Sequence, residues 1–176
     1  MNRTLLLILL LIVSAAGLLA LSLNLNNTPA PTPTPVSVAQ TTLVMSAPVA
    51  STSGLLNSDI RMNTISNTVT AVQIELSYDP NSLGSVDVAA GTFFKNPTEL
   101  FKKIDRVNGR VSYALGVGLG EKGVSGNGVV AKLSFSKLKA TGTTSISFLP
   151  KSLVTSTGIS QSVLKSATGL TFDLAK

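Results

Sequence analysis

The sequence predicts an all-β sandwich of roughly eight or nine short strands, preceded by one N-terminal apolar helix. Short segments alternate apolar and polar residues with a period of two, which is the pattern of a strand half-buried in a sheet. Clusters of glycine, proline, asparagine and aspartate separate these segments, and no convincing helical pattern lies among them. Periodicity alone does not distinguish a jelly roll from an immunoglobulin-like topology.

The chain is expected to have three parts: residues 1–27 as a signal-anchor or signal peptide, residues 28–40 as a Pro/Thr-rich linker, and residues 41–176 as the sandwich domain. The run from Leu5 to Leu23 is uncharged, and as a helix it would be about 28 Å long, close to the ~30 Å hydrocarbon core of a bilayer. Arg3 precedes this run and the next basic residue is Arg61, which predicts a cytoplasmic N-terminus and an exported remainder.

Two interpretations of the N-terminal segment remain open. Ser14, Ala15 and Ala16 are small residues that suit a signal-peptide cleavage site. The apolar run continues to Leu23, which is longer than a cleavable segment usually is and favours an uncleaved anchor. The expected location is therefore the extracellular side of a membrane, with a single N-terminal transmembrane helix as the anchor.

The linker is expected to be either a stalk that holds the domain away from the membrane or a disordered tether with no role beyond reach. Four prolines fall between Pro29 and Pro35, where they impose extended geometry and remove amide donors. Such a segment is a semi-rigid spacer with a reach of ~3 Å per residue.

The first strands of the domain are expected at Thr41 to Ala47 and at Leu56 to Ile65. The clearest strand follows, in the stretch from Val69 to Leu83. One face of it is apolar and the other is mainly polar: Val72, Ile74, Leu76 and Tyr78 against Ala71, Gln73, Glu75 and Ser77. The strand ends at Asp79-Pro80-Asn81, because proline cannot donate to a sheet and Asp and Asn favour turns.

The next strand is expected at Leu83 to Ala89, with Val86 and Val88 facing one way. A single helical turn is expected from Asn96 to Glu99, because proline suits the first position of a helix. Three phenylalanines surround this turn and are interpreted as core residues: Phe93, Phe94 and Phe101.

A hairpin is expected within Ile104 to Leu115, where Asn108-Gly109 tolerates positive φ. A glycine-rich connection follows from Gly116 to Gly128. Three further strands are expected, at Val129 to Leu138, Thr144 to Leu149 and Leu170 to Leu174, with a weakly patterned segment from Leu153 to Lys165.

Composition argues against catalysis and against most cofactors. The chain has no Cys and no His, so it lacks thiolate and imidazole ligands and the commonest general base. Asp and Glu residues show no spacing that singles out a catalytic pair or a calcium loop. Gly118 to Gly123 matches G-x-G-x-x-G, but the glycine-rich sequence behind it cannot open the helix that a dinucleotide site requires. No catalytic, cofactor-binding or metal-binding residue is therefore predicted.

Nucleic acid is not an expected partner. The formal charge is +6, but the basic residues are scattered, as Lys132, Lys137 and Lys139 illustrate. A soluble surface with a weak attraction to anionic polymers of the cell envelope fits this distribution better.

The strand that ends in Tyr78-Asp79-Pro80 and Leu83, followed by the glycine-rich loop and the strand Gly128-Val129-Val130-Ala131-Lys132-Leu133-Ser134-Phe135, resembles the cohesin domain. The resemblance implies a nine-stranded jelly-roll sandwich. It also implies recognition of a dockerin-like protein partner on one flat sheet face, in complexes that degrade polysaccharides or attach proteins to cell surfaces. Aligned on Tyr78-Asp79-Pro80, this face includes Gln73, with Glu75 and Ser77 as neighbours, whereas Ala71 departs from the polar pattern of the type I group.

Two other functions stay open. A carbohydrate-binding module of the same superfamily would have a polysaccharide as its partner. The chain has no Trp and both Tyr are expected in the core, so binding to flat cellulose is disfavoured, whereas a polar groove for soluble glycans is not excluded. A structural, pilus-like surface subunit would associate with itself.

Overall fold

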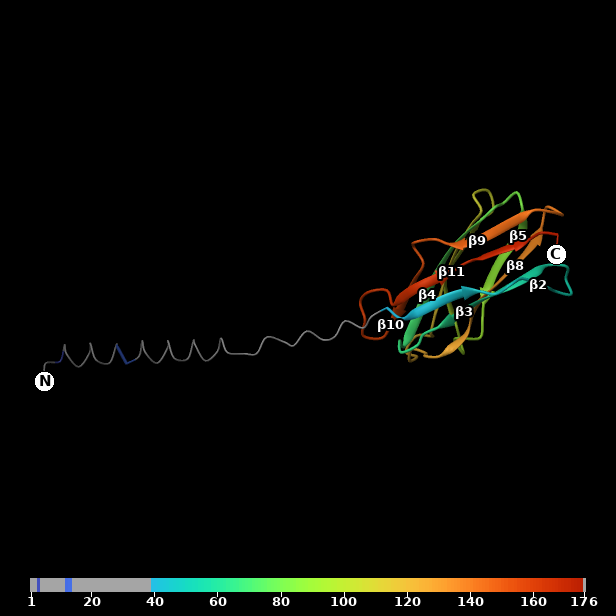
Figure 1. The fold of residues 1–176 in the computed structure, drawn as a ribbon. Helices are drawn as coiled ribbons and strands as arrows, with labels where there is room; N and C mark the ends of the chain where they lie inside the picture. Colours follow the sequence, from blue (N-terminus) through green and yellow to red (C-terminus); the bar gives the residue numbers. More distant parts are fainter. Residues whose placement is uncertain (1–2, 4–11, 14–38, 176) are drawn as a thin grey trace. The chain divides into compact units, whose positions relative to one another are not determined.

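The computed structural model describes residues 3, 12–13 and 39–175 (Figure 1). The chain divides into two units, Met1–Val36 and Ser37–Lys176, and the strands described below lie in the second. Within the described residues, no helix is long and apolar enough to cross a membrane. Apart from residues 12–13, which are helical, the predicted apolar helix from Leu5 to Leu23 lies outside those residues, and so does almost all of the predicted linker.

The described part of the second unit is an all-β sandwich of two six-stranded sheets. From edge to edge, sheet A contains β11 (Leu164–Thr168), β1 (Thr41–Met45), β3 (Leu56–Asn63), β8 (Asn127–Lys137) and β5 (Leu83–Ala90), and the short β2 (Val49–Ala50) pairs with β3. Sheet B contains β12 (Leu170–Asp173), β9 (Thr143–Phe148), β4 (Val69–Tyr78), β7 (Arg110–Gly116) and β6 (Thr98–Asp105), and β10 (Leu153–Ser156) pairs with β4. Neighbouring strands are antiparallel except β1 and β11, which are parallel.

The core lies between the sheets and follows the alternation of the sequence. On β4, Val72, Ile74 and Leu76 are buried, while the residues between them stay half-exposed. Sheet A contributes buried side chains from β1, β3, β5 and β8, among them Leu43, Ile60, Met62, Val86, Val88, Leu133 and Phe135. Each fully buried side chain of this kind contributes about 1.5–3 kcal/mol to the free energy of unfolding. The side of each strand that faces the core is therefore strongly determined. Both tyrosines, Tyr78 and Tyr113, are buried, as predicted.

The structure has more strands than the eight or nine that the periodicity indicates. The weakly patterned segment from Leu153 to Lys165 contains β10 and the start of β11. The two-residue β2 is too short to produce a periodic pattern. These additions are short strands that pair with longer neighbours, which explains why the sequence alone shows them weakly.

The prediction of a helical turn from Asn96 to Glu99 is wrong, because Asn96 lies in a bend and Thr98 begins β6. β6 is an edge strand whose first six residues are all exposed, so its sequence does not alternate. The prediction that Phe101 belongs to the core is wrong for the same reason, since its side chain is 52% exposed. Phe93 and Phe94 are buried as predicted, and their rings pack edge to face with centroids 5.1 Å apart.

The predicted hairpin at Asn108-Gly109 joins β6 to β7. Asp105 Oδ1 accepts hydrogen bonds from the amides of Val107 (3.1 Å) and Asn108 (3.0 Å), which fixes the turn. Gly109 has φ 61° and its carbonyl accepts a hydrogen bond of 2.9 Å from the amide of Tyr78, the last residue of β4. A Cβ on Gly109 would lie 2.1 Å from the carbonyl oxygen of Tyr78, so this contact requires glycine.

We expect Gly109→Ala to lower the free energy of unfolding by about 2 kcal/mol or more, because it adds a clash with the β4 backbone to the cost of a left-handed residue. Urea denaturation measures this loss. Gly54→Ala is the matched control, since Gly54 has φ 79° and open space around its Cβ position. It should cost only about 1 kcal/mol. Equal losses in the two variants would show that the contact with Tyr78 is not tight.

Candidate functional site

The three residues that the sequence singles out lie on one side of β4, facing away from the core. Gln73, Glu75 and Ser77 are half-exposed and alternate with buried residues along the strand. β4 is interior to sheet B, with β7 on one side and β9 and β10 on the other. The three side chains therefore sit near the middle of a broad sheet surface.

The strand register shows which side chains surround them. Gln73 pairs with Ala114 of β7 and Leu153 of β10, and Glu75 pairs with Ser112. Ser77 pairs with Arg110 of β7 and Ser147 of β9. β6 extends the same rows, because its residues pair with those of β7: Phe101 with Ala114, Lys103 with Ser112, and Asp105 with Arg110. We call this surface the β4 face, defined by Gln73, Glu75, Ser77, Phe101, Lys103, Arg110, Ser112, Ala114 and Leu153.

A hydrogen-bond network fixes the centre of the β4 face. Gln73 Nε2 donates to Glu75 Oε1 at 2.9 Å, and Ser112 Oγ donates to Glu75 Oε2 at 2.6 Å. Both oxygens of the half-buried carboxylate are thus held by neighbours, which limits the rotamers of three side chains from two strands. Each oxygen keeps further acceptor capacity, so a partner with hydrogen-bond donors would meet a carboxylate that is already oriented.

Small and apolar side chains flank this network. Ala71 and Gly116 face each other across β4 and β7, and a Cβ on Gly116 would lie 2.9 Å from the Cβ of Ala71. At the β6 edge, Leu100 is 60% exposed and Phe101 is 52% exposed. Small side chains therefore lie beside the central network, and an aromatic side chain projects at one edge of the face. Such a surface suits a protein partner that covers several strands better than it suits a small molecule.

Charged groups border the β4 face on the β6 side. Lys102 Nζ lies 2.9 Å from Asp87 Oδ1 on β5, so this ion pair joins the neighbouring edges of the two sheets. The Lys102 ammonium lowers the pKa of Asp87. Hydrogen bonds from the side chain and amide of Asn108 lower the pKa of Asp105. Beneath the face, burial raises the pKa of Tyr113 to about 12, with a smaller contribution from the charge of Glu99.

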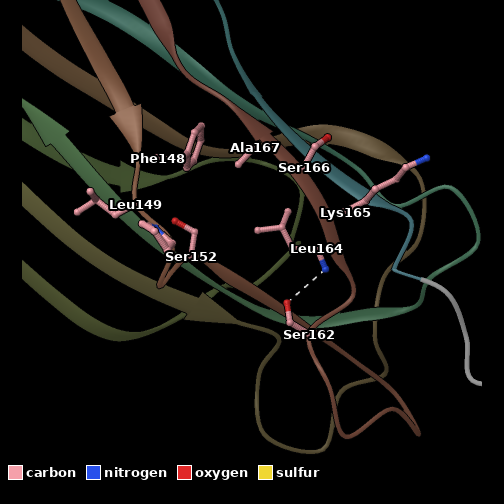
Figure 2. A pocket seen from close by; sticks show the side chains of 9 residues that line it. Phe148, Leu149, Ser152, Ser162, Leu164, Lys165, Ser166 and Ala167 are labelled. Atoms are coloured by element: carbon pink, nitrogen blue, oxygen red, sulfur yellow. Dashed lines mark hydrogen bonds between the residues drawn. The ribbon is translucent and has the colours of Figure 1, made fainter.

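A hollow of about 460 Å³ lies between the end of β9 and the edge strand β11 (Figure 2). In Figure 2 the side chain of Leu164 points into it and that of Lys165 points away. Two of its three hydroxyls already serve the fold: Ser152 Oγ donates to Glu75 O and accepts from Glu75 N, and Ser162 Oγ accepts from the amides of Val154 and Leu164. Through its two bonds, Ser152 braces the strand that carries Glu75.

The described residues offer little for catalysis or metal binding. No group of three or more acidic residues lies close enough there to hold a metal ion. The segment from Gly118 to Gly123 is a loop between β7 and β8, followed by a bridge between Val69 and Val124 and then by a strand. The absence of a following helix agrees with the prediction that this G-x-G-x-x-G motif is a sandwich loop.

Several residues of the β4 face could not be identified from the sequence. Ser112, Ala114 and Leu153 belong to it because of the register of β7 and β10 against β4, and register is set by tertiary pairing. The prediction of Phe101 as a core residue overlooks the charged residues around it, Glu99, Lys102 and Lys103, which indicate an exposed edge strand.

Comparison with known proteins identifies the same architecture. The model of the cohesin domain family matches residues 55–170. No curated protein sequence matches the chain. A non-cellulosomal cohesin from the hyperthermophilic archaeon Archaeoglobus fulgidus has 17% identity and a TM-score of 0.58, and the alignment covers 77% of this chain and 91% of that chain.

Two structures of complexes from Acetivibrio cellulolyticus are also similar. The third cohesin of ScaC, solved with the ScaB dockerin, has 14% identity and a TM-score of 0.61, with 76% of this chain and 98% of that chain covered. A type II cohesin–X-dockerin complex gives 13% identity and a TM-score of 0.56, with 74% and 98% covered. At these identities the structural similarity establishes the fold.

The lowered pKa values predict how stability depends on pH. Asp105, Asp79 and Asp87 each have a folded-state pKa below the ordinary value of 3.8. The stability that these three carboxylates contribute is therefore fully present above about pH 4 and is lost as the pH falls through their folded-state pKa values. We expect the free energy of unfolding, measured in urea, to fall below about pH 4.

Asp105→Asn should make this fall shallower, because it removes one of the three titrating groups while an amide oxygen can still cap the turn. The measurement is a series of urea curves from neutral pH to about pH 3. Identical acid slopes for the variant and the unmodified chain would contradict the assignment of Asp105.

Proposed function

The chain belongs to the cohesin domain family, and from this premise we propose that it is a non-catalytic binding module that recognises a dockerin-like protein partner. The main support for this proposal is the β4 face, a broad outward sheet surface with a pre-arranged polar network and an exposed aromatic residue at its edge. Structures with the same fold include cohesins solved together with dockerins, which supports a partner of this class.

We place the contact region on Gln73, Glu75 and Ser77 and extend it to the neighbouring strands. The bonds that Gln73 and Ser112 donate to Glu75 reduce the entropy that binding would otherwise cost, since these side chains are already ordered. Ala71 offers no side-chain hydrogen bond, so its surroundings would contribute shape rather than polar recognition. The binding mode therefore need not follow the polar pattern of the type I group.

Phe101 is the residue from which we expect the largest single contribution. Exposed aromatic side chains supply much of the energy of protein interfaces, because they bury a large rigid area on association. Phe101 lies beside Ala114, whose small side chain leaves the ring accessible from the centre of the face. A partner helix or loop that covers Gln73 and Ala114 would also cover this ring.

For the cellular setting, we propose that the sandwich is exported and works on the extracellular side of the membrane, as cohesin modules typically do. In this proposal residues 1–27 anchor the chain, residues 28–40 act as a spacer, and residues 41–176 form the binding domain. Dockerins on polysaccharide-degrading proteins would then be held at the cell surface. The sequence features behind this setting are the uncharged run from Leu5 to Leu23 and the prolines of the linker.

We also infer that the sandwich winds as a jelly roll. After β3 the chain crosses repeatedly between the sheets: β4 lies in sheet B, β5 in sheet A, β6 and β7 in sheet B, and β8 in sheet A. The parallel pairing of β1 with β11 brings the first strand of sheet A beside its last one in sequence, at one edge of that sheet.

Binding to dockerins tests the proposed function. We expect the full chain to capture one or more dockerin modules from the organism that makes it. We expect the β4 face to bind none of a panel of polysaccharides. Phe101→Ser should weaken capture about tenfold or more, because it removes a hot-spot side chain without touching the core. Surface plasmon resonance with immobilised dockerin modules gives the dissociation constants.

Val49→Ser is the matched control for Phe101→Ser. Val49 is 67% exposed on β2 of sheet A, so its replacement removes apolar surface away from the β4 face. Affinity should remain unchanged in this variant. Failure to capture any dockerin would reject the proposed partner, and equal loss in the two variants would reject the β4 face as its site.

A further inference from the structure

A row of polar side chains crosses the outer surface of sheet A, which is the face of the sandwich that the proposed dockerin site does not use. Ser166 of β11 pairs with Thr42 of β1, Thr42 pairs with Asn63 of β3, and Asn63 pairs with Asn127 of β8. Residues that pair directly point to the same side of a sheet. Their neighbours Leu43 and Met62 are buried, so the row faces outward. At a strand spacing of about 4.8 Å, the four groups span ~14 Å.

Arg61 lies beside this row at a hollow of about 240 Å³. The hollow is lined by Thr42, Val44, Arg61, Met62, Asn63 and Asn127, and none of these is acidic. The ion pairs within the described part of the chain are Lys102 with Asp87 and Lys139 with Asp79, so Arg61 has no ionic partner there. The exposed guanidinium therefore presents its donors at a hollow whose lining residues carry no carboxylate. Asp59, two residues earlier on the same side of β3, pairs in register with Lys132 and forms no ion pair with Arg61.

The polar groups of the row are available for a ligand. Asn63 Oδ1 accepts a hydrogen bond of 3.1 Å from the amide of Ile65, so the NH2 group of Asn63 remains free to donate. Within the described residues, no side-chain hydrogen bond involves Thr42, Asn127 or Ser166. This differs from the β4 face, where the central side chains bond to one another.

These features define the chemistry of a ligand. An unpaired guanidinium favours a carboxylate, with which it can form two parallel hydrogen bonds. Hydroxyl and amide groups in a row suit a chain of hydroxyl groups, and Val44, 44% exposed in the same hollow, offers a small apolar contact. No aromatic side chain lies in the row, which disfavours the stacking of nucleic acid bases. The formal charge of +6 would help to attract a polyanion.

We propose that the outer surface of sheet A, at Arg61 and the row from Ser166 to Asn127, binds an acidic glycan. Arg61 pairs with a carboxylate of the polysaccharide, and Thr42, Asn63 and Asn127 hydrogen-bond to its hydroxyl groups. This site lies on the other sheet from the β4 face, so a glycan and a protein partner would bind at the same time. The domain would then connect a dockerin-bearing protein to an acidic polysaccharide, such as one built from uronic acids.

Polygalacturonate is the probe for this site, with its fully methyl-esterified form as the uncharged counterpart. We expect the immobilised full chain to bind polygalacturonate in biolayer interferometry, to bind the ester at least about tenfold more weakly, and to lose affinity as salt is raised. Arg61→Gln should weaken binding about tenfold or more, which is the loss of a charge-assisted hydrogen bond. Equal binding of the ester would overturn the assignment of a carboxylate to Arg61.

Lys132→Gln is the matched charge control. Lys132 is exposed on β8 of the same sheet, where it pairs in register with Asp59 and does not line the hollow. Its replacement should leave affinity within about twofold. Equal weakening by both variants would show diffuse attraction rather than a site. Polyglutamate carries carboxylates without hydroxyls, and binding as tight as that of polygalacturonate would overturn the glycan specificity, as failure to bind polygalacturonate would overturn the proposal.

Discussion

The alternation of β4 is the constraint on which the rest of the structure depends. Val72, Ile74 and Leu76 on one side of the strand form the centre of the core, and Gln73, Glu75 and Ser77 on the other side form the centre of the β4 face. A slip of one residue would exchange the two sets, exposing three large apolar side chains and burying a carboxylate without its hydrogen bonds. The burial energy that fixes the register of β4 therefore also determines which side chains lie on the β4 face.

The contacts around β4 keep this register in place. The close approach of Gly109 to Tyr78 fixes where β4 ends relative to the β6–β7 turn, and Ser152 bonds to both backbone groups of Glu75. Ser112 reaches the Glu75 carboxylate from β7. Backbone and side-chain contacts from both sides of β4 thus converge on the position of one acidic side chain. A partner would meet a site whose geometry is set by the fold and not by the encounter.

The strands with regular alternation were predictable from the sequence, and the strands that owe their place to pairing were not. β4 and β8 could be located because each buries one face in the core. The turn at Gly109 could be located because its positive φ is a local backbone property that favours glycine. β6 was missed because an edge strand with exposed faces has no alternation, and Phe101 was misassigned with it. The alternation of the strand was enough to place Gln73 and Glu75 on the outward side of β4, whereas their proposed role came from the resemblance to cohesins. Ser112 and Leu153 required the register, which depends on residues far apart in the chain.

The two outer faces of the sandwich differ in how they satisfy their polar groups. On the β4 face the central carboxylate is hydrogen-bonded within the fold, so the recognition proposed there would depend on shape, on the oriented carboxylate and on the exposed ring of Phe101. On the outer surface of sheet A the guanidinium of Arg61 has no ionic partner among the described residues, and the row beside it keeps free donors. A rigid, internally bonded surface suits a folded protein, because little entropy is lost on association. A surface with free donors suits a flexible, hydroxyl-rich polymer, because the polymer itself can adapt to fixed groups. The same two-layer fold can therefore present two kinds of binding surface without any change in its core.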